Sequence, residues 1–241
     1  MMNIGVIFAG GVGSRMRSKG TPKQFLIVNG KPIIAHTIQV FQDSEDIDAV
    51  VVSILEENIL LMEKIVKDFH LTKVSKIVAG GKTGQLSIYN GLEAASSLSS
   101  SGKDVVLIHD GVRPLIDKSL IRKNIDSVNL NGSAITTSPA KETFLLVGED
   151  HKVEEVVDRK KSYIAKAPQS FFLEDILKVQ KDAISKNIID AIDSSTLMSL
   201  YNKRLFVVEG PYENIKITTP DDFYMFKALF DARENAQIFG I

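Results

Sequence analysis

A glycine-rich turn near the amino terminus carries the residue types needed to hold a phosphate group. An apolar run, Ile4–Ala9, leads directly into Gly10-Gly11-Val12-Gly13, and glycines let backbone N–H groups close on phosphate oxygens. A helix that begins near Ser14 would point its positive end at the same place. Arg15 and Lys23 supply two fixed cations just beyond the glycines. The pattern therefore predicts a site for a nucleoside triphosphate whose phosphates react.

The glycine turn by itself has other interpretations. Met16 stands where the third glycine of a dinucleotide fingerprint belongs, and no Gly-Lys-Ser/Thr sequence follows to complete a P-loop. A tight strand-to-helix turn with solvated charges would also explain the glycines. Arg15 and Lys23 favour the phosphate site, because they place two cations close to the turn.

A second candidate site lies in residues 108–114, Ile-His-Asp-Gly-Val-Arg-Pro, at the end of the apolar run Asp104–Ile108. A carboxylate at the carboxyl end of a strand is well placed to hold Mg²⁺ against phosphate oxygens, so Asp110 is the candidate metal ligand. Alternatively, Asp110 caps the following turn and pairs with Arg113, an arrangement that is compatible with metal binding. We expect His109 to pack or to orient backbone rather than to catalyse.

The composition excludes several classes of protein and site. The 241 residues are 44% hydrophobic and 24% charged, ordinary values for a soluble globular protein. A net charge of −1 gives no electrostatic footprint for nucleic acid or an acidic membrane. The absence of cysteine rules out disulfides, thiolate metal sites and cysteine nucleophiles. No leader pattern and no apolar run of the roughly 20 residues that span a bilayer is present, so we expect a soluble cytoplasmic enzyme.

Strand-like and helix-like patterns alternate through the first half of the chain, which predicts a doubly wound, mostly parallel α/β sheet. In such a sheet, ligands bind at the carboxyl ends of the strands. The expected strands are Ile4–Ala9, Ala49–Leu55, Val74–Ala79 and Asp104–Ile108, and the expected helices are Lys31–Gln42, Glu57–Phe69 and Ser87–Ala95.

The pattern changes after residue 132. Ser133–Ser138 is an expected strand, and Thr143–Val147 and Lys152–Val157 form an expected hairpin across residues 148–150. We interpret the chain as a single domain, 1–241, from which residues 139–165 project as a β-arm. Further expected elements are helices over Leu173–Ser185 and Ser195–Tyr201, a strand over Arg204–Val208, and a last helix with Thr219 as its cap and Pro220 in its first turn.

Six motifs then occur in one order and at spacings typical of one enzyme family. They are residues 9–16 with 22–25, 79–81 with 87–88, 109–114, 157–159, 167–169 and 214–218. By these motifs the chain resembles the polyol-phosphate cytidylyltransferases, a group that contains the methylerythritol 4-phosphate and ribitol 5-phosphate enzymes. The resemblance covers essentially the whole chain and implies a Rossmann-like nucleotidyltransferase fold.

The resemblance implies an activity and a set of site residues. The family transfers CMP from CTP to a polyol phosphate and releases pyrophosphate, with Mg²⁺ as cofactor. Nucleotide binding would involve Ala9, Gly10 and Gly11 at the cytosine and ribose, Gly81, Lys82 and Ser87 closing over the base, and Gly13 with Asp110 at the triphosphate and its Mg²⁺. Catalysis would depend on Arg15, Lys23 and Lys216, and the acceptor would be bound by Arg113 and Arg159.

The likeness also implies a homodimer with shared active sites. Arg159, on the β-arm, would reach the acceptor phosphate in the site of the partner subunit. Alternatively, Arg159, Lys160 and Lys161 form a solvated basic tip of the arm without a role in binding. Lys216 could likewise be a solvated strand residue near a loop.

Three departures from the family pattern concern base closure and the choice of acceptor. Many members carry an arginine where this chain has Gly84, a threonine where it has Ala167, and a polar residue near the position of Ile192. The Ala-Gly-Gly opening and the sequence Pro168-Gln169-Ser170-Phe171 resemble the ribitol enzymes, which favours D-ribitol 5-phosphate as the acceptor. The alternative acceptor is 2-C-methyl-D-erythritol 4-phosphate. The first product would feed a teichoic-acid-like or capsular polymer, and the second would feed isoprenoid synthesis.

Two other classes of function remain to be separated from this one. A catalytically silent nucleotide-binding subunit would release no pyrophosphate, but the presence of Arg15, Lys23 and Asp110 argues against it. An NAD(P)-dependent oxidoreductase is disfavoured by the incomplete glycine fingerprint.

Overall fold

A seven-stranded sheet forms the centre of the computed structural model, which describes residues 1–10, 21–99 and 101–239. The strand order is β11-β7-β10-β6-β1-β4-β5. β10 runs antiparallel to both of its neighbours, and the other described pairings within this sheet are parallel. In order across the sheet the bounds are β11 Val207–Glu209, β7 Ser133–Pro139, β10 Tyr163–Phe172, β6 Val105–Asp110, β1 Asn3–Ala9, β4 Ala49–Ile54 and β5 Val74–Ala79.

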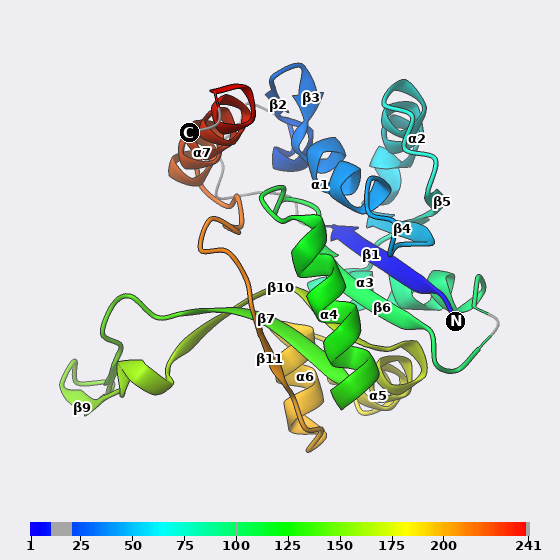
Figure 1. Cartoon of the computed structure of the whole chain (residues 1–241). Helices are drawn as coiled ribbons and strands as arrows, with labels where there is room; N and C mark the ends of the chain where they lie inside the picture. The colour runs from blue at the N-terminus through cyan, green and yellow to red at the C-terminus, as the bar shows by residue number, and fades with distance from the viewer. Residues whose placement is uncertain (11–20, 100, 240–241) are drawn as a thin grey trace.

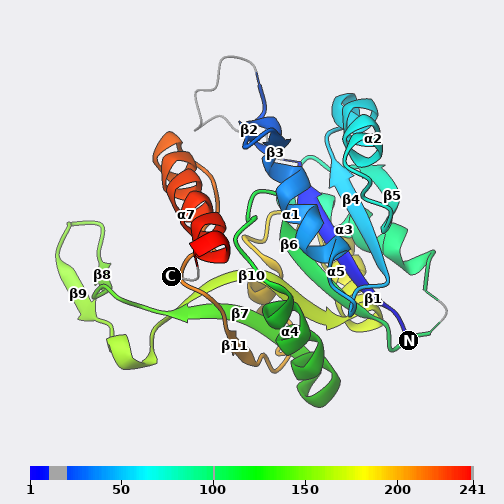
Figure 2. The same ribbon diagram turned by 45° about the horizontal axis from the view of Figure 1, so that its top comes forward.

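Helices cover both faces of this sheet, as the doubly wound expectation requires (Figures 1 and 2). One face packs against α1 (Ile33–Gln42), α2 (Ile59–Asp68) and α4 (Lys118–Asn131). The other face packs against α3 (Gly84–Ser96), α5 (Leu173–Ser185) and α6 (Ser194–Leu200). Because each inner strand contributes alternate residues to the two cores, strands such as β4 are buried along their whole length and read as continuous apolar runs.

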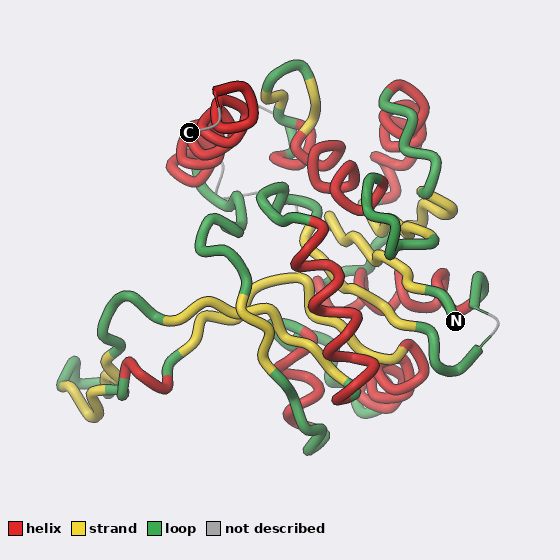
Figure 3. The backbone as a smooth tube through the Cα atoms, viewed as in Figure 1, coloured by secondary structure: helices red, strands yellow, loops and turns green. Residues whose placement is uncertain are grey.

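An arm projects from the sheet, and segment 139–165 makes up its length (Figure 1). The ends of β7 and β10 pair outside the main body, where Tyr163 lies opposite Pro139. Beyond them, β8 (Leu145–Val147) and β9 (Val153–Val156) form the predicted hairpin. Figure 3 shows β7 and β10 side by side as they leave the body. The apolar side chains of the hairpin are exposed, including those of Leu146, Val153 and Val156.

The carboxyl-terminal helix α7 (Pro220–Phe239) begins where the sequence predicts. The Asp222 carboxylate accepts hydrogen bonds from the backbone N–H groups of Thr218 and Thr219, each at 2.8 Å. Phe226 and Phe230 of α7 pack against α1 around His36. Within the described part of the chain, no helix combines the length and the apolar character needed to cross a membrane.

Several elements differ from the sequence-based expectations. α1 begins at Ile33 rather than Lys31, because Lys31–Pro32 pairs as β3 with β2 (Ile27–Val28) and Pro32 caps the helix. A short 3-10 turn, Glu56–Asn58, precedes α2. Neither α4 nor β10 is among the predicted elements.

Candidate active site

The predicted site residues at the ends of β1 and β6 meet at one edge of the sheet. β1 and β6 are neighbours, and Phe8 lies opposite Asp110 in their register. Ala9 and Gly10 therefore continue beside Asp110 at the carboxyl ends of these strands. This is the place where an open α/β sheet binds its ligands.

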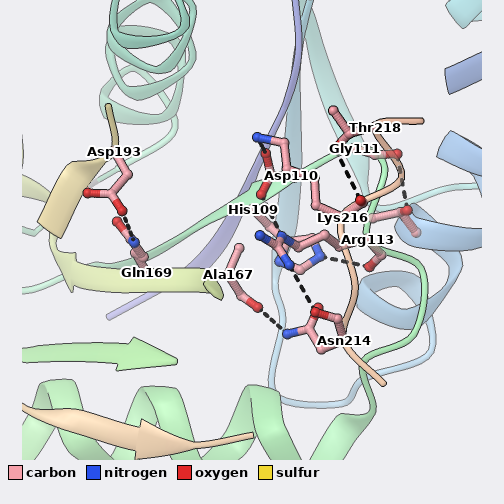
Figure 4. Close-up of polar contacts among 11 residues, drawn as sticks. His109, Asp110, Gly111, Arg113, Ala167, Gln169, Asp193, Asn214, Lys216 and Thr218 are labelled. Atoms are coloured by element: carbon pink, nitrogen blue, oxygen red, sulfur yellow. Dashed lines mark hydrogen bonds and ion pairs between the residues drawn. The ribbon is translucent and has the colours of Figure 1, made fainter. Parts of the chain in front are cut away.

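Asp110 holds two cations at once (Figure 4). Its Oδ2 lies 2.8 Å from Arg113 Nε, and its Oδ1 lies 2.7 Å from Lys216 Nζ. Burial by itself would raise the pKa of the Asp110 carboxyl, but Lys216 and Arg113 outweigh it and lower that pKa to about 2. Asp110 is therefore ionised throughout the neutral range. The predicted pairing with Arg113 is present, and Lys216 joins it from a segment more than 100 positions along the chain.

Arg113 is fixed by its backbone as well as by its side chain. Its Nη1 donates to the Asn214 carbonyl oxygen at 2.9 Å, and its own carbonyl oxygen lies 3.0 Å from His109 Nε2. His109 is fully buried beside Phe41, and this burial lowers its pKa to about 4. The imidazole is neutral near pH 7 and contacts the backbone. This arrangement is the one expected of a histidine that packs and orients backbone.

The glycines of the site permit a close approach between backbone and the Ser87 side chain. Ser87 Oγ accepts a hydrogen bond from the Gly81 N–H at 3.0 Å and donates to the Thr83 carbonyl at 3.0 Å. A Cβ on Gly10 would lie 2.6 Å from Ser87 Oγ, and one on Gly81 would overlap the Leu86 side chain. A larger residue at Gly10 would therefore displace the Ser87 side chain, and one at Gly81 would displace the first turn of α3.

A buried glutamine holds the predicted triphosphate lysine near the same strand. Gln24 Nε2 donates to the Ala9 carbonyl oxygen at 3.2 Å. This contact anchors the 3-10 turn Lys23–Phe25 beside the end of β1. Lys23 is thereby placed next to Ala9 and Gly10 at the carboxyl end of β1.

Two cavities open next to Asp110. The first, here called the loop cavity, has a volume of about 420 Å³, and the second, the β10 cavity, about 300 Å³. Phe8, Gly84, Asp110 and Lys216 line both of them. Their shared wall is therefore the place where a ligand in one cavity would meet a ligand in the other.

Most of the predicted residues that the structure describes fall into this arrangement. The loop cavity is lined by Ala9, Gly10, Lys23, Gly81, Lys82, Asp110 and Lys216, and the β10 cavity by Arg113. Ser87 lines neither cavity, but its hydroxyl group binds the backbone of Gly81 and so holds the loop before α3. Gly11, Gly13 and Arg15 lie outside the described residues.

Arg159 does not join the cavities of its own chain. It lies on the arm, where its Nη1 donates to the Lys141 carbonyl oxygen at 3.3 Å, and it lines neither cavity. A role for Arg159 in acceptor binding therefore depends on the expected second subunit.

The β10 cavity also contains residues that were not predicted for the site. Lys166, Gln169 and Asp193 line it. Gln169 Nε2 donates to Asp193 Oδ2 at 3.0 Å, and the Asp193 Oδ1 caps α6 by accepting from the Thr196 N–H at 2.7 Å. The Ala-Pro-Gln motif pointed to Gln169, but no local pattern pointed to Lys166. Ile192, one of the three departures from the family pattern expected from the sequence, also lines this cavity and is 93% exposed.

The donor set fits a magnesium ion that is shared with a substrate. Among the described residues no group of three or more His, Asp or Glu side chains could hold a metal by itself. Mg²⁺ is commonly bound by one or two carboxylates together with substrate phosphates and water. A single ionised carboxylate on the shared wall matches that mode, and Lys216, whose side chain is 42% exposed, has room to move away from Oδ1.

Comparison with known proteins identifies the family. The family profile described as IspD, 2-C-methyl-D-erythritol 4-phosphate cytidylyltransferase, matches residues 3–232. The chain belongs to the IspD family. One relative of this family, a ribitol-5-phosphate cytidylyltransferase from Streptococcus agalactiae serotype V, is 65% identical over 241 residues and is covered completely, as is this chain.

Other members of the family are more distant. A 2-C-methyl-D-erythritol 4-phosphate cytidylyltransferase from Clostridium acetobutylicum is 38% identical, with 95% of this chain and 97% of that protein covered. The crystal structure of 4-diphosphocytidyl-2C-methyl-D-erythritol synthase from Anaerococcus prevotii superposes with a TM-score of 0.82 at 26% identity, covering 95% of this chain and 96% of that one. The IspD-family fold agrees with the α/β sheet expected from the sequence, and the protein is a cytidylyltransferase.

Proposed function

We propose that this protein transfers CMP from CTP to D-ribitol 5-phosphate, forming CDP-ribitol and pyrophosphate. The observation that carries the proposal is the wall formed by Asp110 and Lys216 between two adjacent cavities. CTP would occupy the loop cavity and the acceptor the β10 cavity, so that the two reacting phosphates meet at this wall. The 65% identity to a ribitol-5-phosphate enzyme, against 38% to a methylerythritol phosphate enzyme, supports ribitol 5-phosphate as the acceptor.

The reaction exchanges one phosphoanhydride bond for another. An oxygen of the acceptor phosphate attacks the α-phosphorus of CTP, a new P–O–P bond forms, and the bond to the β-phosphate breaks as pyrophosphate leaves. Both reactants are anions, and their approach in an unlined site would be strongly unfavourable. Lys216, together with Lys23 and Arg15, would offset the charge that builds on the α-phosphoryl group and on the leaving pyrophosphate.

The nucleophile needs no general base, because a phosphate oxygen is already anionic. This agrees with a site in which the imidazole of His109 is neutral and contacts the Arg113 backbone. Mg²⁺ held by Asp110 would supply further neutralisation of the phosphate oxygens. Positioning and electrostatics would therefore account for the rate, without a covalent intermediate.

The remaining site residues divide between the two substrates. Ala9, Gly10 and Gly11 would contact the cytosine and ribose, Gly81 and Lys82 would close over the base with Ser87 holding Gly81 in place, and Gly13 would approach the triphosphate. Arg113 would bind the acceptor from its own chain. Arg159 would bind it from the partner subunit's arm, residues 139–165, in a homodimer with shared sites. We place the enzyme in the cytoplasm, where it would supply CDP-ribitol for a teichoic-acid-like or capsular polymer.

A pyrophosphate-release screen tests this function. The protein is assayed with Mg²⁺, each of CTP, ATP, GTP and UTP, and each of ribitol 5-phosphate, methylerythritol 4-phosphate and other polyol phosphates. We expect the highest kcat/KM for CTP with ribitol 5-phosphate. A higher kcat/KM with methylerythritol 4-phosphate would reverse the choice of acceptor, and no pyrophosphate release with any pair would contradict the proposal.

A further inference from the structure

Lys166 is a buried lysine that lines the β10 cavity, and the described ion pairs leave it without a carboxylate partner. Its residue exposure is 8%, and it belongs to the central strand β10. The register of β10 against β7 shifts between Ala165 and Gln169, so residues 166–168 leave the regular ladder. Such bulges redirect side chains and are common beside active sites. The bulge accounts for a lysine that lines a cavity from within a sheet.

The contacts of the Lys166 ammonium leave part of its charge uncompensated. Its Nζ donates to the Tyr212 carbonyl oxygen at 2.8 Å and lies 4.9 Å from the centre of the Tyr212 ring. Among the described residues, no carboxylate lies within 4.0 Å of this nitrogen. A buried ammonium with one carbonyl partner retains two N–H donors and loses much of its hydration. A site of this kind favours an anion.

Other cations surround the same position. Arg113 and Lys216 line the same cavity, and Lys141 contacts the same tyrosine, with its Nζ 3.5 Å from the centre of the Tyr212 ring. Arg113 donates to Asp110 and to the Asn214 carbonyl, and Lys216 is paired with Asp110, so the charges of both cations are compensated by the carboxylate on the shared wall. Lys166 has no comparable commitment. Among the described cations that line this cavity, Lys166 is therefore the one whose charge is not paired with a carboxylate.

We propose that Lys166 binds the phosphate group of the acceptor and helps to hold it toward Asp110 and Lys216. This inference rests on the proposed function in one respect, because it takes the ligand of the β10 cavity to be a phosphate monoester. Burial, followed by the charge of Arg113, lowers the pKa of Lys166 to about 8 although the charge of Glu213 opposes the shift, which is consistent with an ammonium that no described carboxylate contacts directly. Lys166 would bind the acceptor and would not act as a nucleophile, because the proposed reaction joins the acceptor phosphate directly to the α-phosphorus of CTP.

Kinetics of Lys166→Gln and Lys166→Arg test the proposal. Glutamine keeps a donor for the Tyr212 carbonyl but removes the charge, and arginine keeps the charge. We expect Lys166→Gln to raise the acceptor KM about 10- to 100-fold, because the substitution removes a hydrogen bond between two charged groups. The CTP KM should change by less than about threefold, since CTP would occupy the other cavity. Lys166→Arg should recover a large part of the loss. The matched control is Lys178→Gln, an exposed lysine on α5 outside both cavities, and it should behave as wild type.

A second measurement separates phosphate binding from other roles. Inorganic phosphate is titrated as an inhibitor at saturating CTP, and its inhibition constant against the acceptor is compared between wild type and Lys166→Gln. We expect the constant to rise in parallel with the acceptor KM. An unchanged phosphate constant, or equal losses for CTP and acceptor, would overturn the proposal, as would an acceptor KM that does not change.

The two proposals fail in different ways. If wild-type protein released no pyrophosphate with ribitol 5-phosphate, the proposed acceptor would be wrong. Calorimetric titration with inorganic phosphate would still test Lys166, because weaker binding to folded Lys166→Gln than to wild type supports the assignment and equal binding refutes it. Melting temperatures of the variants establish that each is folded.

Discussion

At the scale of single residues, Asp110 determines how the charges of the site are arranged. One carboxylate holds Arg113 on one side and Lys216 on the other, with both distances below 3 Å. A buried carboxylate with two cationic partners stays ionised and keeps those partners in fixed positions. Because Asp110 lies on the wall between the cavities, any change to it alters the lining of both cavities.

Replacing Asp110 with asparagine should remove Mg²⁺-dependent turnover while the protein stays folded. A neutral amide is a poor ligand for Mg²⁺ and no longer attracts Arg113 and Lys216, so we expect kcat to fall on the order of 10²–10³-fold. The partly exposed Lys216 side chain can turn toward water, which limits the loss of stability. Pyrophosphate release over a Mg²⁺ titration, with circular dichroism as the folding control, measures the effect. Unchanged activity in Asp110→Asn would show that the metal ligand is assigned wrongly.

At the scale of elements, the packing of α7 against α1 holds the segment that supplies Lys216. Phe226 and Phe230 surround His36, with ring centres 6.2 Å and 4.7 Å from the imidazole. His36 Nε2 lies 2.9 Å from the Val28 carbonyl oxygen, which ties α1 to β2. Ile217, one residue after Lys216, is buried in the same cluster. The position of Lys216 therefore depends on how well this helix pair packs.

The packing around His36 should make stability depend on pH. Burial lowers the pKa of His36, and Lys31 adds to this while the Val28 carbonyl and Glu234 oppose it. Because the folded pKa lies below the unfolded value of about 6.5, the unfolded chain binds a proton that the folded chain resists. The free energy of unfolding should therefore fall as the pH drops below about 6.5.

Urea unfolding of wild type and His36→Gln at pH 7.5, 6.5 and 5.5 checks this expectation. Glutamine retains a donor for the Val28 carbonyl but does not titrate, so the variant should lose less stability between pH 7.5 and 5.5. The buried His109 contributes in the same direction to both proteins and cancels in the difference. Parallel pH profiles for the two proteins would rule out His36 as the source.

At the scale of the whole molecule, the arm carries features that its own chain does not use. Arg159 lines neither cavity, and apolar side chains of β8 and β9 are exposed along the hairpin. Exposed apolar side chains grouped on a projecting element are typical of an interaction surface. A homodimer in which each arm reaches the site of the other subunit would use both features.

Mixing two inactive chains tests this shared-site dimer. In a heterodimer of Arg15→Ala and Arg159→Ala chains, one site would contain both substitutions and the other would contain neither. We therefore expect activity approaching half that of wild type, although each homodimer alone is nearly inactive. Heterodimers are isolated with two different affinity tags, and light scattering confirms their mass. Heterodimers as inactive as the parents would argue for self-contained sites.

Local sequence patterns were sufficient to predict those elements in which all the residues favour the same secondary structure. Leu173–Ser185 and Val74–Ala79 have the predicted bounds, because helical apolar spacing marks the first and a short apolar run that ends at Gly80 and Gly81 marks the second. β10 was missed since Pro168 stands inside it, and proline in a run argues against a central strand. The bulge over 166–168 resolves this conflict by releasing the proline from the ladder. α4 was missed although Asp117 caps it and Gly132 ends it in a left-handed conformation.

For the site, the sequence by itself indicated which residues have the types needed to bind phosphate and metal, but not which of them lie together in space. The glycines, Lys23 and Asp110 stood out because the expected phosphate and metal binding requires particular residue types at strand ends and in short motifs, and Lys216 stood out through the family resemblance. Tertiary structure alone decided that Lys216 pairs with Asp110, that one wall serves two cavities, and that Lys166 is buried without a carboxylate partner among the described residues. The physical reason is that charge compensation and burial depend on distances between segments far apart in the chain, and no local pattern encodes those distances.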